Sequence, residues 1–437
     1  MKSLNYGPKG WLLFAYQFLA YIGFTVFTNW PMNILADMYG GASLMSTLYT
    51  VGAVIAIVIT LVISAFIGKI KSMKRVGCIL GVIAMIFAFC VMTVPAGTLY
   101  LVCYFGGCIF IPLWATFSIG VLIGQWFPTK KGAFMGIVTL AFPITNGIIG
   151  LFAGQVFKKG YPDPFSAFLP YFIICLIGLI IGITMLKDYP EQCGAYRDND
   201  KNMTPEKANA ILMEEIEAKK TSVWKLGRTM TNRDYWFTTI PIGALLMTSV
   251  GLMTQTNSII GSYGEAMNRF GGFAGVMAVV MVAGLIGSFG IGLLDQGLGT
   301  KKALILSSIL MLISGLIGMI PSAGAGFAAL LILAAYMGAS SNFLVSVSAQ
   351  YWRREDFSSV FATINPVANI IQAIGPMIIA ILMATRGTQG VYTMIMVTGI
   401  ISIILMILFS PKHIKEVDDK RRAAVGKPLD DALVGRK

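Results

Sequence analysis

The chain has 437 residues, of which 56% are hydrophobic and only 12% are charged, and its mean hydropathy is +0.76. A soluble protein of this length needs many more charged residues to cover its surface, so the composition excludes a soluble globular protein. The net charge of +13 is the one feature of the composition that suggests a nucleic-acid partner.

Ten long runs of the sequence contain no Asp, Glu, Lys or Arg. Because a helix needs about 20 apolar residues to cross the hydrocarbon core, eight of these runs are long enough for one span. Two longer runs hold two spans each, divided by the turn signals Pro95-Ala96-Gly97 and Pro321-Ser322-Ala323-Gly324. We therefore expect twelve transmembrane helices. The runs are residues 10–36, 38–68, 76–129, 132–157, 164–186, 235–264, 270–294, 303–352, 357–385 and 387–411.

The basic residues lie almost entirely on one side of this predicted membrane. Alternating the spans puts 29 of the 33 Lys and Arg on the side of both termini, and the exceptions are Lys158, Lys159, Arg269 and Arg386. This positive-inside asymmetry predicts a multi-pass protein of the cytoplasmic (inner) membrane with both termini in the cytoplasm. The basic charge therefore reports topology and contact with lipid, and we expect the bilayer but no nucleic acid as a partner.

The longest hydrophilic segment inside the chain, residues 188–235, follows the sixth predicted span. It divides the chain into an N-terminal six-helix bundle (1–187), a central cytoplasmic loop and a C-terminal six-helix bundle (236–411). Within the loop, Thr204-Pro205-Glu206 predicts the start of a short helix, for which a solvated linker is the alternative. Residues 412–437 are charged and lack a long apolar run, so we expect a disordered cytoplasmic tail.

The two halves of the chain resemble each other. The segment from Trp126 to Gly132, between the fourth and fifth spans, has a counterpart from Trp352 to Ser358 at an offset of 226 residues. A second pair of loops, Ser64 to Arg75 and Gly292 to Lys302, has an offset of 228 residues. Two similar offsets indicate an internal duplication, a common plan among transporters.

Over essentially its whole length the chain resembles the major facilitator superfamily, whose loop signature is Gly-x-x-x-Asp-x-x-Gly-x-Lys/Arg-Lys/Arg. The second copy keeps Gly292, Gly299, Lys301 and Lys302, with Gln296 at the Asp position. The first copy departs further from the signature. Ser64 and Gly68 occupy its Gly and Asp positions, and the basic residues Lys69, Lys71, Lys74 and Arg75 follow. The missing Asp puts in question the contact that it makes with a neighbouring helix of the family. The resemblance implies an all-α fold of two pseudo-repeated six-helix bundles.

The segment from Gln125 to Gly132 is similar to the Trp-Phe-Pro-x-Lys/Arg-Arg-Gly segment of the oxalate/formate antiporter and monocarboxylate group. This resemblance implies transport of an organic acid, by antiport among other modes.

The superfamily lines a central cavity with spans one, four, seven and ten, flanked by two, five, eight and eleven. Polar and indole groups in these spans are our candidate substrate-binding residues, because an uncompensated polar group in hydrocarbon is costly. Hydrogen bonding between helices is the alternative role for each of them. The candidates are Asn29, Trp30, Asn33, Tyr49, Trp114, Asn146, Gln255, Asn257, Asn342, Asn365 and Asn369; Thr116, Ser340, Ser341 and Gln372 are further polar residues of these spans.

No Asp, Glu, Lys, Arg or His lies inside any predicted span, and Asp37, Glu265, Arg269 and Asp295 occur only at the ends. A small dianion is therefore a poor fit, whereas a monoanion, a larger amphipathic acid or a neutral solute remains open. A proton-driven carrier needs a titrating group within the membrane, so we expect uniport or exchange.

We therefore expect a secondary transporter of a small or amphipathic organic acid, working as a monomer and without a cofactor. The alternatives are an exporter of hydrophobic or drug-like compounds and, from another class, a membrane sensor or receptor. We do not expect an enzyme, because the sequence offers no cluster of His, Asp, Glu and Cys at a membrane face. The six cysteines lack the spacing of metal ligands, and no Walker-type motif is present.

Overall fold

Helices are the only regular structure in the part of the chain that the computed structural model describes. That part comprises residues 5–34, 41–65, 70, 72–95, 97–118, 122–127, 131–148, 164–200, 202–204, 206, 207, 210, 213, 222–353 and 356–427.

The N-terminal half consists of long apolar helices, several of which are interrupted. The first span begins as α1 (Gly7–Phe24), passes through one π-helical turn, η1 (Thr25–Asn29), and continues as α2 (Trp30–Ile34). It is followed by α3 (Ala42–Ala65), α4 (Met73–Thr93), α5 (Thr98–Thr116), α6 (Leu122–Trp126), α7 (Lys131–Val138) and α9 (Pro164–Thr184).

The C-terminal half repeats this pattern after a connection that includes η4 (Pro190–Cys193), η5 (Arg197–Asn199) and α11 (Leu226–Met230). Its seventh span is interrupted at Gln255, and its tenth at Ser341. The helices are α12 (Arg233–Thr254), α13 (Thr256–Gly261), η6 (Gly264–Phe270), α14 (Gly272–Leu298), α15 (Thr300–Gly318), α16 (Ala323–Ser340), α17 (Asn342–Tyr351), α18 (Phe357–Leu408) and α19 (Pro411–Ala423).

Ten helices in the described residues are long and apolar enough to cross a membrane. One of them, Ser359–Leu408, would be about 75 Å long if straight, more than twice the thickness of the hydrocarbon core. It contains Gly387 with φ of 62°, a conformation that favours glycine, and the chain turns there into a second span. The shorter apolar helix Phe134–Ile148 occupies the predicted fifth span. The helices therefore match the twelve predicted crossings.

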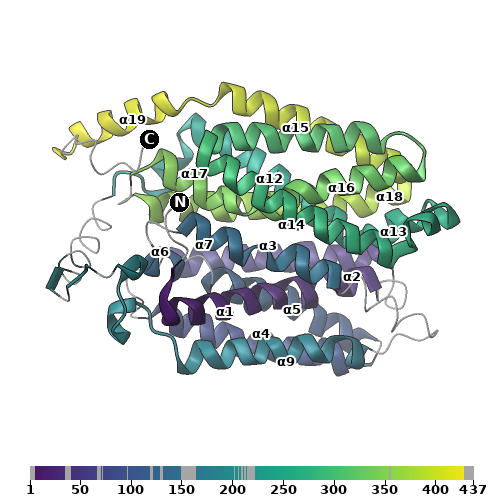
Figure 1. Ribbon diagram of the computed structural model, residues 1–437, viewed down its shortest axis with the longest axis horizontal. Coiled ribbons are helices and arrows are strands. Elements are labelled where there is room, and N and C mark those ends of the chain that lie inside the picture. Colours follow the sequence, from purple (N-terminus) through teal and green to yellow (C-terminus); the bar gives the residue numbers. More distant parts are fainter. Residues whose placement is uncertain are drawn as a thin grey trace.

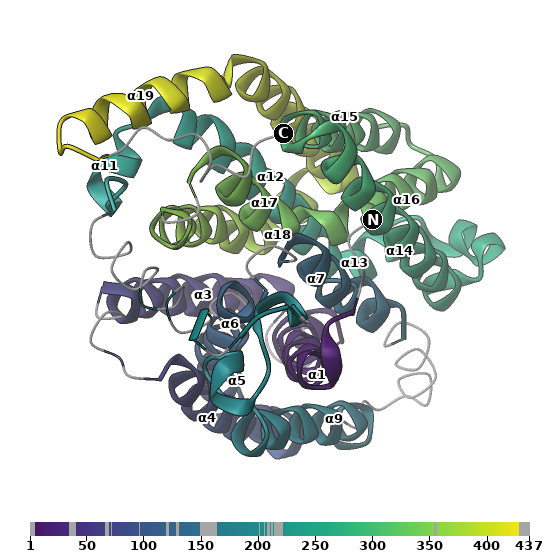
Figure 2. The ribbon, with the colours of Figure 1, turned by 60° about the vertical axis from the view of Figure 1, so that its left-hand side comes forward.

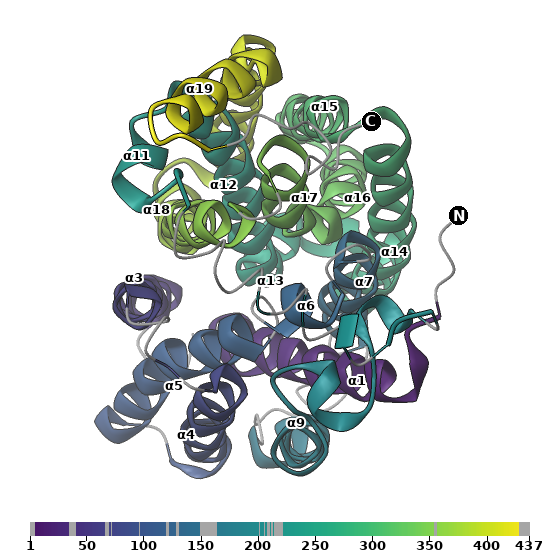
Figure 3. The same ribbon diagram turned by 90° about the vertical axis from the view of Figure 1, so that its left-hand side faces the viewer.

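The two sets of helices lie side by side (Figure 1). In Figures 2 and 3, α1, α4, α5 and α9 form one group, while α12 and α14 to α18 form the other. Helices α3 and α7 lie at the boundary, where α3 contacts α18 and α7 contacts α14 and α17. Any space between these helices is therefore walled by both halves of the chain.

Equivalent lysines support the internal duplication in three dimensions. Lys74 at the start of α4 donates from Nζ to the Ile183 carbonyl at the end of α9, at 2.8 Å. Lys301, 227 residues later (301 − 74), donates from Nζ to the Phe409 carbonyl after α18, at 2.6 Å. Positive charge near the last carbonyls of a helix is favourable, so each lysine stabilises the end of the last span in its half.

The contact left in question by the worn loop signature is supplied from elsewhere. The Asp188 carboxylate accepts from the Ser72 hydroxyl at 2.6 Å and from the Lys74 backbone N–H at 2.8 Å. In the other half, Asp295 accepts from the Thr300 hydroxyl at 2.6 Å. A carboxylate thus caps the start of the third span, but it comes from the end of the sixth span rather than from the loop.

The predicted disordered tail is wrong for residues 412–423, which belong to helix α19. Two charged side chains of this segment are buried in ion pairs: Asp418 binds Arg353 at 2.7 Å, and Arg422 binds Asp356 at 2.5 Å. Asp418 also accepts from the Trp224 indole N–H at 2.8 Å. These contacts tie α19 to the loop between the tenth and eleventh spans, which the charge pattern alone did not reveal. Most of the predicted helix after Thr204 lies outside the described residues.

Close helix packing in the second half depends on Gly287 of α14. A Cβ atom at this position would lie 2.0 Å from the Ala335 carbonyl oxygen of α16, whereas one at Gly290 meets nothing within 4 Å. We predict that Gly287→Ala destabilises the protein by about 1–3 kcal/mol through overpacking. Gly290→Ala, in the same helix, should leave stability unchanged or slightly raised because alanine favours helix. Thermal unfolding in detergent measures both, and equal midpoints would contradict this packing.

Candidate substrate cavity

A cavity of about 160 Å³ lies between the two halves. Its walls come from α1, α3, α5, α7 and the helix that follows it, α12, α16, α17 and α18. Ten lining side chains are polar, and none of the lining side chains is charged. The polar ones are Tyr21, Tyr49, Thr60, Thr116, Ser249, Ser340, Ser341, Asn365, Asn369 and Gln372.

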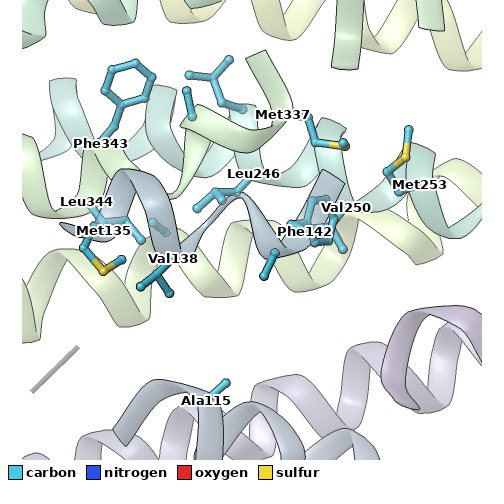
Figure 4. Close-up of a cluster of buried hydrophobic side chains, with 14 of the residues drawn as sticks. Ala115, Met135, Val138, Phe142, Leu246, Val250, Met253, Met337, Phe343 and Leu344 are labelled. Atoms are coloured by element: carbon cyan, nitrogen blue, oxygen red, sulfur yellow. The ribbon is translucent and has the colours of Figure 1, made fainter. Parts of the chain in front are cut away.

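The remaining wall is apolar and comes from both halves. Figure 4 shows Met135, Phe142, Leu246, Val250, Met337 and Leu344 gathered on one side, with Ala115 of α5 on the opposite side. Such a wall can hold the apolar part of a solute without directional requirements. The polar groups must therefore supply orientation and specificity.

The largest polar cluster of the cavity lies on α18. Asn365, Asn369 and Gln372 follow one another at i, i+4 and i+7, which puts them on one face of the helix. Asn369 donates from Nδ2 to Asn365 Oδ1 at 3.1 Å, so these two amides form a pair. Pro366 lies between them and lacks an N–H, which leaves one backbone carbonyl of the preceding turn without its helical donor.

Two tyrosines reach this cavity from the other half. The Tyr49 hydroxyl of α3 interacts with the Gln372 side chain, and the Tyr21 hydroxyl of α1 interacts with Ser341. Ser341 is the residue at which the tenth span is interrupted between α16 and α17. Polar contacts across the cavity therefore join helices of the two halves.

Three of the eleven predicted binding residues line the cavity, namely Tyr49, Asn365 and Asn369. Thr116, Ser340, Ser341 and Gln372, which were noted in the same spans, also line it. Sequence reasoning missed Tyr21, Thr60 and Ser249. Thr60 follows Tyr49 by eleven residues, which is three turns along the same face of the helix. The prediction for Tyr49 could therefore have been extended to Thr60. That these residues bind substrate remains a prediction.

Three of the other candidates, in the first and fifth spans, lie outside the cavity lining. The Trp30 indole N–H donates to Asn146 Oδ1 at 3.1 Å, and Asn146 donates in turn to the Phe142 carbonyl at 2.9 Å. Asn29 is buried beside Thr28, whose hydroxyl donates to Asn29 Oδ1 at 3.2 Å. The bond between Trp30 and Asn146 connects two helices, as their alternative role predicts, whereas the bond of Asn29 stays within its own helix.

Trp114 belongs to the interior of the N-terminal half. Its indole N–H donates to the Tyr16 hydroxyl at 3.3 Å, and Tyr16 is hydrogen-bonded to Ser118 at 2.7 Å. Trp114 is only 1% exposed and is absent from the cavity lining. The sequence places Trp114 in a predicted cavity-lining span, but its side chain points into its own half.

Two candidates join the halves instead of facing the cavity. Gln255 donates from Nε2 to the Ser46 hydroxyl at 3.0 Å, and Asn342 Oδ1 accepts from the Thr139 hydroxyl at 2.9 Å. Asn257 is exposed, and the side chain of Asn33 lies outside the described residues.

The halves are in contact near the start of α3. Ser46 binds Gln255 there, and the Thr50 hydroxyl donates to the Ala373 carbonyl at 2.8 Å. The cavity lies farther along α3, from Tyr49 to Thr60. These two bonds join the halves at the side where α3 begins, and the cavity lining extends along α3 toward the side where it ends.

Comparisons with known proteins support the fold. The sequence profile of the Major Facilitator Superfamily matches residues 245–434. The human organic anion transporter MFSD10 (TETRAN) has a similar structure, with a TM-score of 0.64 and 12% identity over 92% of this chain and 100% of that one. No curated protein matches the sequence.

A bacterial homologue of the human lysosomal transporter Spinster, solved in an inward-facing and unoccupied conformation, is also similar. Its TM-score is 0.54, with 13% identity over 97% of this chain and 98% of that one. The predicted fold class is confirmed: the chain has the major facilitator fold and is a multi-pass membrane protein.

The hydrogen bond between Ser46 and Gln255 leads to a prediction for a double-mutant cycle. Each single change, Ser46→Ala or Gln255→Leu, leaves its partner buried and unsatisfied, whereas the double change removes both groups. We expect the double variant to lose about 0.6 kcal/mol less than the sum of the singles, the average for such pairs in bilayers. Thermal unfolding of the four proteins measures this, and additive effects would mean that the two side chains act independently.

Proposed function

We propose that this chain, which has the major facilitator fold, is a secondary transporter of a small or amphipathic organic acid. It works by alternating access of one cavity to the two sides of the membrane, as a uniporter or an exchanger. The observation that carries the proposal is the cavity that both halves wall, with neutral polar groups on an otherwise apolar surface.

The size of the cavity favours a small solute. Pockets for drug-sized ligands typically measure about 300–1,000 Å³, whereas this cavity measures about 160 Å³. A solute with a short apolar body and one polar group matches both the volume and the lining. An exporter of hydrophobic or drug-like compounds, the second candidate, would need a larger space.

The comparisons support a membrane transporter of the major facilitator superfamily rather than an enzyme or a receptor. One structural neighbour is the human organic anion transporter MFSD10, and the segment from Gln125 to Gly132 is similar to that of acid carriers. Both observations favour an acid over a neutral solute.

The domain division and the topology are part of the proposal. Residues 1–187 and 236–411 form the two bundles, joined by the central loop 188–235, and residues 412–437 follow as the C-terminal segment. The chain lies in the cytoplasmic (inner) membrane with both termini in the cytoplasm. The protein works as a monomer. The cavity then extends toward the cytoplasm, where α3 ends.

Substitutions in the cavity test the proposed site. We predict that Tyr49→Phe and Asn369→Leu each lower exchange of a carboxylic acid in a counterflow screen with purified protein in liposomes. A lost hydrogen bond that leaves its partner unsatisfied costs about 1–3 kcal/mol, or roughly five- to 150-fold in affinity. Thr385→Ala is the control, because Thr385 is exposed on α18 and bonds only its own helix. Normal exchange by both cavity variants would rule out this site.

Reporter fusions test the topology. We predict cytoplasmic signals from reporters placed after residue 437 and within 188–235, because the basic residues gather on that side. A reporter within 158–164 should give an external signal. An external C-terminal reporter would overturn the orientation and, with it, the assignment of the open side of the cavity.

A further inference from the structure

We infer that the cavity takes a carboxylic acid in its neutral, protonated form, and that the paired carboxamides of Asn365 and Asn369 recognise the COOH group. This inference rests on the proposed function, since it specifies which form of the organic acid is bound.

The geometry of the amide pair supplies the first argument. The bond from Asn369 Nδ2 to Asn365 Oδ1 leaves the Asn365 amide N–H groups and the Asn369 carbonyl oxygen available at the cavity surface. The pair therefore presents a donor next to an acceptor. Exchanging the oxygen and nitrogen of both amides produces the same combination, so the argument does not depend on how the amides are oriented.

The chemistry of the two forms of an acid supplies the second argument. A carboxylate only accepts hydrogen bonds, so it matches a pair of donors such as the guanidinium of Arg. A protonated carboxyl group has one donor and one acceptor, which is the complement of the amide pair. The Asn369 oxygen would face a carboxylate oxygen with no proton between them, which is repulsive.

The charge of the surroundings supplies the third argument. The titratable groups that line the cavity are Tyr21 and Tyr49, and Cys108 lies beside Tyr49. Such side chains ordinarily titrate near pH 10 and pH 8.5, and no lining residue carries a positive charge. Arg353, in the loop before α18, is bound to Asp418 instead. A carboxylate enclosed in this cavity would therefore have no counter-charge.

Magnitudes favour the neutral form once the cavity closes around the solute. An acid with a pKa of about 4.3 is neutral in about one molecule in 500 at pH 7, so protonation weakens apparent binding by about that factor. Enclosing a carboxylate without a partner disfavours its charged form by roughly 10³–10⁵-fold. Protonating the acid in water therefore costs less free energy than enclosing its charged form in the cavity.

The proton balance is simple. The acid takes a proton from water on the loading side, crosses as RCOOH, and releases the proton to water on the other side. One proton thus moves with each acid, although no side chain of the protein has to bind it. The pH dependence of transport then belongs to the substrate, and a neutral analogue should show none.

Counterflow with three probes tests the inference. Purified protein in liposomes, with the same pH on both sides, is given L-lactate, its neutral amide lactamide, or the permanently charged 2-hydroxyethanesulfonate. The signal of protein-free liposomes is subtracted at each pH. At low total concentration we expect lactate exchange to fall about tenfold from pH 6 to pH 7, following its neutral form. Lactamide exchange should stay constant, and the sulfonate should not exchange.

The outcomes separate the inference from the proposed function. Lactate exchange that is constant with pH, or exchange of the sulfonate, overturns the neutral-acid inference and leaves acid transport standing. If lactate does not exchange above the protein-free signal at any pH, acid transport fails and the inference falls with it.

A variant tests the amide pair itself. Asn369→Leu removes the acceptor and should lower exchange of both lactate and lactamide by about five-fold or more. Thr385→Ala on the same helix should exchange both probes as the parent does. Lactamide exchange of Asn369→Leu at the parental rate would overturn the role of the pair, and the thermal midpoint of each variant shows that it is folded.

Discussion

The lack of water in the bilayer core is the constraint on which the rest of this structure depends. Backbone polar groups must be satisfied within helices, and charges must stay at the helix ends. Lys74 and Lys301 illustrate the result, because each binds a carbonyl at the end of the last span of its half. Asp188 caps the start of the third span, and Asp295 binds the Thr300 hydroxyl at the start of the ninth. The ends of the bundle therefore hold the charge, and its interior is neutral.

The same constraint decides where polar side chains inside the membrane point. Gln255, Asn342 and Trp30 each bind a side chain of another helix, so one polar atom of each is satisfied without a ligand. Asn365 and Asn369 bind each other and are only partly buried, which leaves hydrogen-bonding capacity facing the cavity. Helix connection and the proposed substrate recognition thus use the same residue types, and the hydrogen-bond partner of each side chain distinguishes the two roles.

Sequence reasoning predicted the spans well because charge-free runs measure bilayer thickness directly. It even separated the two spans within α18, since Arg386 stands beside the turn at Gly387. The site was harder, because hydropathy identifies polar residues within a span but not the helix face or the partner. Trp114 lies in a predicted cavity-lining span yet points into its own half. Helix α19 was missed because Asp418 and Arg422 pair with residues more than 60 positions away.

The cavity and the contact between the halves are built from neighbouring residues. On α3, Tyr49 lines the cavity while Thr50 binds the other half; on α18, Gln372 lines the cavity while the Ala373 carbonyl accepts from Thr50. A solute can shift an equilibrium between two states only by binding them unequally. A solute bound between Tyr49 and Gln372 would contact the residues next to Thr50 and Ala373, whose hydrogen bond joins the two halves. Binding of the solute and separation of the halves at this bond would therefore involve the same turns of α3 and α18. Because all these groups are neutral, the halves can separate there without exposing an unpaired charge to the hydrocarbon.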